Sequence, residues 1–162
     1  MISSQDSDEI LSRLLKEHEL IDSYTKTLQK YNNEGDKSQL QTHIVRLIDF
    51  FETDLIKHFA IEERYIFPAI LLNSPSLENI GTTLKLTNAH GALTLEAENI
   101  NDALKVTLEN EQAISNQLSE HLQGFMEKLK GHAQEEMQTL YPMVSRSPQT
   151  VTSICSLLKS KK

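Results

Sequence analysis

The sequence predicts an all-α protein, an antiparallel up-down-up-down four-helix bundle with a short extra C-terminal helix. Apolar residues recur at helical spacing along most of the 162-residue chain. Only 5 Gly and 4 Pro are present, which leaves few residues for the many turns of a strand-rich fold. Long helical stretches separated by short turns are typical of a bundle in which neighbouring helices run in opposite directions.

The ends of the predicted helices follow from capping and turn residues. We expect helices at about 8–31, 36–72, 75–108, 112–143 and 148–159. Asp36 is a capping-box candidate, and Ser74 and Ser147 each stand directly before a proline, as N-cap residues often do. We therefore expect a single domain over 1–162, with the bundle at about 8–143 and the terminal helix at about 148–159.

Composition excludes several classes of protein. The formal net charge is −7, from 16 Lys and Arg against 23 Asp and Glu, so nucleic acid and anionic membranes are poor candidates as partners. A lone cysteine, Cys155, excludes an internal disulfide framework and a thiolate-rich metal site. The opening MISSQDSDEI lacks the basic and apolar regions of a secretory signal, and no apolar run reaches membrane-spanning length. The expected location is the cytoplasm.

A repeat carries most of the functional prediction. The segments HFAIEERYIFP (58–68) and HAQEEMQTLYP (132–142) share a His, a Glu four residues later, an aromatic residue nine later and a Pro ten later. The matched pairs are His58 with His132, Glu62 with Glu136, Phe67 with Tyr141, Pro68 with Pro142 and, seven residues before each His, Phe51 with Phe125. His18 lies 40 residues before His58, and His90 lies 42 residues before His132, each among leucines. The chain therefore resembles two helical hairpins of similar design.

Helical geometry brings these residues together. Positions four apart lie on one face of a helix, so His58 and Glu62 can point at the same interior spot, and the matched pair can do so from another helix. Antiparallel packing can bring His18 and His90 to that level. Imidazoles and carboxylates suit divalent first-row metals, and two such ions would offset two buried glutamates. Six protein ligands shared by two metals would leave open positions for a small molecule.

Each element taken alone has a structural explanation. A single histidine on an apolar stripe is commonly a hydrogen-bonded core residue, and a single His-x-x-x-Glu is commonly a surface pair. The joint pattern favours a metal site. We expect Glu63 and Glu135 to be solvated and His43 and His121 to be structural or surface residues. Tyr65 could donate a hydrogen bond near the metals or serve in packing, and Phe51 and Phe125 are expected in the core.

The two segments resemble the signatures of the hemerythrin-like, or HHE cation-binding, domains, and the resemblance covers roughly 11–143. It implies iron: His18, His58, His90 and His132 as terminal ligands of two iron ions, and Glu62 and Glu136 bridging them, with an oxo or hydroxo bridge. Oxygen-carrying hemerythrins have a fifth histidine one turn from that of the third helix and an aspartate five residues after the last histidine. The corresponding positions here are Leu86, Thr94 and Met137. The chain is more similar to the four-His, two-Glu branch, which includes iron–sulfur cluster repair proteins and an iron-sensing domain.

Competing bundles fit less well. Ferritin-like di-iron proteins use Glu-x-x-His pairs, and zinc hydrolases of one large class use H-E-x-x-H; the chain has neither. We favour binding or sensing of O2, NO or peroxide at an open iron position, with that small molecule as the partner and no catalytic residue. The alternatives are iron handling or iron–sulfur cluster repair as an iron donor, and an enzyme that reduces peroxide or NO. The terminal helix is expected to cover the bundle end or to mediate association of copies.

Overall fold

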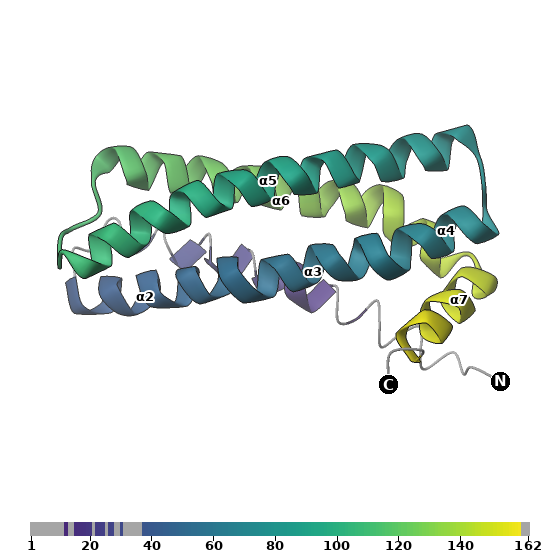
Figure 1. Cartoon of the computed structure of the whole chain (residues 1–162), viewed down its shortest axis with the longest axis horizontal. Helices are drawn as coiled ribbons and strands as arrows, with labels where there is room; N and C mark the ends of the chain where they lie inside the picture. The colour runs from purple at the N-terminus through teal and green to yellow at the C-terminus, as the bar shows by residue number, and fades with distance from the viewer. Residues whose placement is uncertain are drawn as a thin grey trace.

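The described residues are helical almost throughout. The structure, a computed structural model, describes residues 12, 15–20, 22–24, 26–27, 30 and 37–159. The elements are the helical residues within 12–30, α2 (Lys37–Asp49), η1 (Phe50–Asp54), α3 (Leu55–Ile61), η2 (Glu62–Ile66), α4 (Phe67–Asn73), α5 (Leu77–Glu109), α6 (Asn116–Ser145) and α7 (Pro148–Lys159) (Figure 1). The described residues include no strand, and the predicted all-α class is confirmed. Ile10, Leu14, Ile21, Leu28 and the turn expected at 32–36 lie outside the described residues.

The elements α2 to α4 form one continuous helical rod. The residues at their junctions keep right-handed helical dihedrals. Within the rod, η1 and η2 are π-helical: the Leu55 amide donates to the Phe50 carbonyl and the Phe67 amide to the Glu62 carbonyl, five residues back. The second wide turn directly precedes Pro68, whose ring would otherwise clash with a carbonyl of the preceding turn. The helix therefore accommodates Pro68 by a local change of helix type.

Serine side chains begin the two longest helices. Ser76 Oγ accepts from the Asn79 amide at 3.0 Å, and Ser115 Oγ accepts from the Leu118 amide at 3.1 Å. The N-cap of α5 is therefore Ser76, and the prediction of Ser74 was wrong by two residues. The Ser74 amide instead donates to the Ile70 carbonyl, a bond that belongs to the end of α4. Glu111, at φ 51°, closes α5 in the left-handed conformation.

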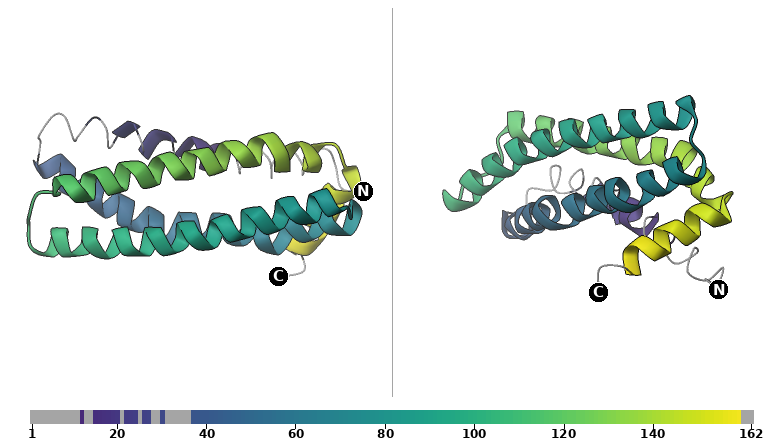
Figure 2. Two further views of the ribbon diagram at one scale, coloured as in Figure 1. Left: turned by 90° about the horizontal axis from the view of Figure 1, so that it is seen from above. Right: turned by 45° about the vertical axis from the view of Figure 1, so that its right-hand side comes forward.

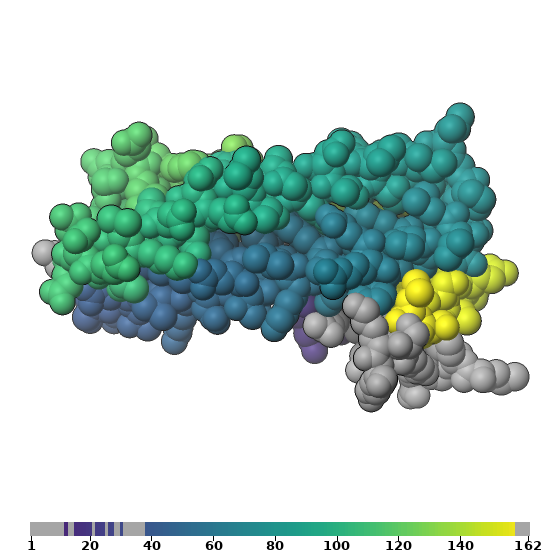
Figure 3. All heavy atoms as spheres, in the orientation of Figure 1, coloured from purple at the N-terminus to yellow at the C-terminus, as the bar shows by residue number. Residues whose placement is uncertain are grey.

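The helices pack along the length of an elongated molecule. α5 contacts both α2 and α6, and the views from two further directions agree that the long helices lie side by side (Figure 2). Figure 3 shows α7, in yellow, at one end of the molecule. There it packs against α4, η2 and α6. Ser147 caps α7, since its Oγ accepts from the Thr150 amide at 3.2 Å. No described helix combines the length and apolarity needed to cross a membrane.

Two apolar clusters divide the core. The first contains Phe51 and Phe125, whose rings meet edge to face with centroids 5.5 Å apart, as expected of core residues. The second contains Phe67 and Tyr141 together with apolar residues of α7. Along the rod, α5 and α6, a band of buried histidines and glutamates separates the two clusters. The fold therefore encloses a polar layer between two dry ones.

Candidate metal centre

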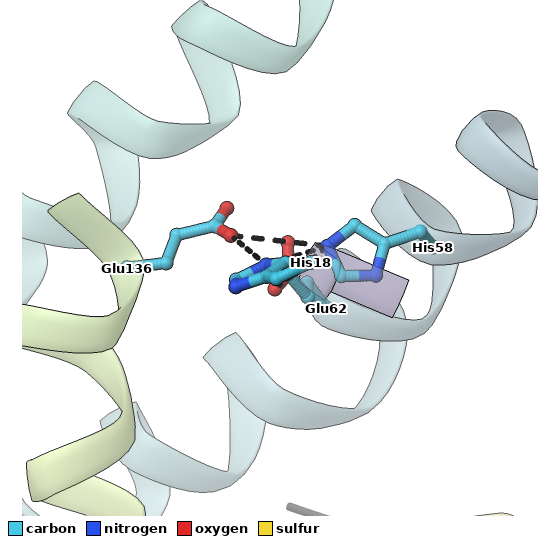
Figure 4. A group of neighbouring side chains, drawn as sticks. All are labelled: His18, His58, Glu62 and Glu136. Atoms are coloured by element: carbon cyan, nitrogen blue, oxygen red, sulfur yellow. Dashed lines mark hydrogen bonds and ion pairs between the residues drawn. The ribbon is translucent and has the colours of Figure 1, made fainter. Parts of the chain in front are cut away.

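The six residues predicted as metal ligands meet in this polar layer. His18 comes from the N-terminal helical residues, His58 from α3, Glu62 from the start of η2, His90 from α5, and His132 and Glu136 from α6. All six are buried; the most exposed, His132, retains 8% of its surface, and both glutamates retain 0%. Figure 4 shows the side chains of His18, His58, Glu62 and Glu136 converging from different segments.

The donor atoms fall into two groups that share both glutamates. The first group, group A, is His18, His58, Glu62 and Glu136, and the second, group B, is Glu62, His90, His132 and Glu136. Within each group, the ligand atoms all lie within 4.8 Å of one another. Each group could hold a metal ion.

In group A, the imidazole Nε2 atoms face one oxygen of each carboxylate. His18 Nε2 lies 3.1 Å from Glu136 Oε2, and His58 Nε2 lies 3.4 Å from Glu62 Oε1 and 3.8 Å from Glu136 Oε2. The two Nε2 atoms are 3.3 Å apart. The first group thus uses Glu62 Oε1 and Glu136 Oε2.

Group B uses the other oxygen of each carboxylate. His90 Nε2 lies 3.2 Å from Glu62 Oε2 and 3.2 Å from Glu136 Oε1. His132 Nε2 lies 2.6 Å from Glu136 Oε1. Each carboxylate therefore turns one oxygen to each group, which is the arrangement of a bridging ligand.

Buried atoms without hydrogen bonds support a metal at this place. Within the described part of the chain, Glu62 Oε2 and His132 Nε2 are buried and lack a hydrogen-bond partner, although an ion-pair atom is close to each. Leaving such atoms without a well-formed hydrogen bond in a dry core is costly. A cation between the imidazoles and carboxylates would satisfy them, and nitrogen and oxygen donors of this kind suit a divalent first-row metal. The residues present fit such an ion.

Two further glutamates orient the rings from outside. Glu17 Oε2 lies 2.5 Å from His58 Nδ1, and Glu63 Oε1 lies 2.9 Å from His90 Nδ1. A carboxylate at Nδ1 keeps the proton there and leaves the Nε2 lone pair facing the centre. Glu63 is exposed, as predicted, but its carboxylate also bonds His90, which the sequence did not indicate. Glu135, by contrast, contacts the exposed Lys85.

Aromatic rings complete the walls. Phe59 stacks on His90 with centroids 4.0 Å apart, and Phe67 stacks on the same imidazole at 5.7 Å. Tyr141 stacks on His18 at 5.4 Å, and its hydroxyl donates to Glu62 Oε1 at 3.3 Å. Tyr141 thus brings a hydroxyl group to the centre. Tyr65, considered from its position after Glu62, packs against the second apolar cluster.

In the metal-free centre, protons on the histidines balance the charge of the buried glutamates. Burial lowers the pKa of His58 and His90, but contacts with Glu136 and the other glutamates outweigh this effect and raise the pKa to about 10 and about 9. Burial and the neighbouring Glu136 raise the pKa of Glu62 to about 7. Burial also opposes ionisation of Glu136, yet the surrounding imidazoles hold the pKa of that carboxyl well below its usual range. Bound cations would replace these protons.

The remaining histidines lie elsewhere. His121 is exposed, and its Nε2 lies 3.2 Å from Glu96 Oε1 on the surface. His43 is half-buried on α2, where burial and the charge of Arg46 lower its pKa. Neither belongs to the groups described above. Sequence spacing correctly predicted that His43 and His121 lie outside the metal centre. It gave no signal for the roles of Glu17 and Glu63.

Comparison with known proteins agrees with the centre. No curated protein and no solved structure matches the chain. A family model, the hemerythrin HHE cation binding domain, matches residues 9–144, which include all six donor residues and Tyr141. The match covers most of the chain and the whole polar layer. The chain therefore belongs to the hemerythrin HHE cation-binding domain family.

Proposed function

We propose that the protein holds two iron ions, one in group A and one in group B. We further propose that it binds or senses O2, NO or peroxide at an open iron position. The observation that carries the proposal is the division of each carboxylate: Glu62 and Glu136 both turn one oxygen to each group. A pair of ions bridged by both carboxylates uses all four oxygens and neutralises two buried anions. Iron, when bound, supplies redox-active positions that take up a small molecule.

The chain itself orients the imidazole ligands and keeps water out of the centre. Glu17 and Glu63 hold two of the imidazoles with Nε2 inward. Phe59 and Phe67 cover His90 and, with the apolar clusters on either side, exclude water from the centre. A dry surrounding strengthens the interactions of charges within it and protects a bound reactive molecule from protons. These features favour retention of a small ligand.

The positions that distinguish oxygen carriers support the four-His, two-Glu branch. Leu86, one turn before His90, is buried and apolar. Met137, five residues after His132, is 37% exposed, so it offers no carboxylate to the centre. We therefore propose binding or sensing in preference to oxygen transport.

The fold that we propose for this function is an antiparallel up-down-up-down four-helix bundle. The described helical residues within 12–30 would belong to its first helix, the rod from α2 to α4 would be its second, and α5 and α6 its third and fourth. The meeting of His18, His58, His90 and His132 at one level supports this topology. The predicted cytoplasmic location stays a prediction.

The test is metal loading followed by exposure to ligand. The protein is loaded with ferrous iron without oxygen, quantified for metal, and then mixed with O2 or NO while the visible spectrum is recorded. We expect two irons per chain and new ligand-to-iron absorption. His58→Ala and Glu136→Ala should lose most of the iron, because each removes a buried donor.

The matched control is His121→Ala, which removes a surface imidazole outside the centre. This variant should keep both irons. A wild-type protein that cannot be loaded with iron would contradict the proposal, as would equal iron content in His58→Ala and His121→Ala.

A further inference from the structure

One difference between the two halves of the centre lies at a matched pair of aromatic residues. Phe67 and Tyr141 occupy the same position in the repeated segments, nine residues after His58 and His132. Their rings also lie alike: Phe67 stacks on His90 at 5.7 Å and 18°, and Tyr141 stacks on His18 at 5.4 Å and 17°. At this matched position, the two pseudo-symmetric halves therefore differ by a single hydroxyl group.

That hydroxyl lies among the donor atoms of group A. Tyr141 Oη is 3.1 Å from His18 Nε2 and 3.3 Å from Glu62 Oε1. Donor atoms that bind one first-row metal at roughly 2.1 Å stand about 3 Å apart when they are neighbours around it. The donor pairs within group A are separated by similar amounts: 3.1 Å from His18 to Glu136, 3.4 Å from His58 to Glu62 and 3.8 Å from His58 to Glu136. By this measure, Tyr141 Oη stands where a further ligand of the same ion would stand.

Tyr141 contacts one bridging carboxylate, that of Glu62, on the side that faces group A. It meets Glu62 at Oε1, the oxygen that faces His58, whereas Oε2 of the same carboxylate faces His90. The matching ring in the other half, Phe67, carries no polar atom. Group B therefore has no aromatic oxygen at the matched position.

We propose that Tyr141 is a seventh protein ligand, coordinating the metal of group A and leaving the metal of group B as the one that accepts an external ligand. The inference rests on the proposed function, since it needs two metals. Coordination of the phenol oxygen releases its proton to solvent and changes no oxidation state. The two iron ions would then differ in their ligands. The ion of group A would have no position left for an external ligand, and the ion of group B would keep one.

The experiment uses full-length protein loaded to two ferric ions per chain, with resonance Raman spectroscopy and azide titration as readouts. Wild-type protein should show the ring vibrations of an iron-bound phenolate and should bind one azide per chain. Tyr141→Phe should lose these vibrations and the associated visible absorption, keep both irons, and bind a second azide. Tyr65→Phe is the matched control, because it removes another tyrosine hydroxyl from the same end of the core, and it should behave as the wild type.

The outcomes separate this inference from the proposed function. Two irons with no phenolate vibrations in the wild type, or unchanged spectra and azide stoichiometry in Tyr141→Phe, would overturn the seventh ligand while leaving the di-iron centre intact; Tyr141 would then only donate a hydrogen bond to Glu62. A wild-type protein without iron would overturn both.

Discussion

Two imidazoles of the centre, those of His58 and His90, contact an outer carboxylate at Nδ1 and the central carboxylates at Nε2. This arrangement determines which nitrogen can bind a metal. Glu17 fixes His58 and Glu63 fixes His90 through Nδ1, so Nε2 carries the lone pair that faces the carboxylates. The two rings come from groups A and B, so each group has one imidazole backed by an outer carboxylate. Orientation and basicity of the donors are therefore set by residues that do not themselves face the centre.

Removing these outer carboxylates should weaken metal binding without removing a ligand. We expect Glu17→Ala and Glu63→Ala each to lower metal affinity by roughly 10- to 100-fold, the usual effect of losing such a partner. Competition with a chromophoric chelator measures the change. Glu135→Ala is the control, because Glu135 contacts Lys85 on the surface. Equal affinity in all three variants would show that the outer contacts do not support the centre.

Sequence spacing predicts the inner residues of the centre and misses the outer ones. His58 with Glu62 and His132 with Glu136 follow directly from the four-residue period of a helix. Glu17 and Glu63 are each adjacent in sequence to an inner residue, and adjacent residues on a helix normally point in different directions. Their contacts with histidines on other segments depend on how those segments pack, which no local pattern reports.

At the scale of elements, the wide turns of the rod depart from ideal helical spacing. The bond from the Phe67 amide to the Glu62 carbonyl spans five residues, so η2 contains more residues per turn than the helix around it. π-helical turns occur frequently at functional sites. Here η2 begins at Glu62 and also contains Glu63, so it presents both the bridging glutamate and the outer one. A 3.6-residue period predicts the helix but not this local widening.

Helix ends allow a separate test of the fold. Ser76→Ala and Ser115→Ala each remove a side-chain acceptor from the first turn of a long helix. Each should lower the free energy of unfolding by about 1 kcal/mol. Urea unfolding of the metal-free protein measures this change without interference from metal binding.

Ser74→Ala is the matched control. Ser74 follows α4 and is not the N-cap of α5, so its removal should change the free energy of unfolding by less than about 0.5 kcal/mol. A loss at Ser74 as large as that at Ser76 would contradict the observed start of α5. The sequence signal of serine before proline was correct at Ser147 and misplaced at Ser74, because Ser76 competes for the same role two residues later.

At the scale of the whole molecule, the centre connects segments far apart in the chain. Its donors come from the N-terminal helical residues, the rod, α5 and α6. A ligand that binds only the folded protein stabilises it, by about 4 kcal/mol when present at 1,000 times its dissociation constant. Metal bound here would therefore stabilise the packing of all these segments at once.

The difference in Tm between metal-loaded and metal-free protein should grow as the pH rises from about 6.5 to about 8.5. In the metal-free protein the raised pKa values, about 10 for His58 and about 9 for His90, stabilise the fold fully below the ordinary value of 6.5, and this contribution is lost as the pH approaches them. Metal binding must displace the same protons, so it strengthens over the same range. Scanning calorimetry with Mn2+ measures both states.

A Glu136→Ala variant provides the control, since without a bridging carboxylate metal should shift its Tm little at any pH. The opposite trend in the wild type, a difference that shrinks as the pH rises, would show that protons on the histidines do not compete with the metal.

The sequence by itself determined the helical class and the six inner residues of the centre. The class and the two His-x-x-x-Glu pairs follow from short-range periodicity: a helix repeats every 3.6 residues, and each such pair keeps its two side chains on one face wherever the helix packs. The other two residues, His18 and His90, were indicated by their similar distances before these pairs. The tertiary structure alone decided the division of each carboxylate between group A and group B, the outer contacts of Glu17 and Glu63, and the place of the Tyr141 hydroxyl beside His18. These depend on the rotation and offset of separate helices, which are set by the packing of the whole core.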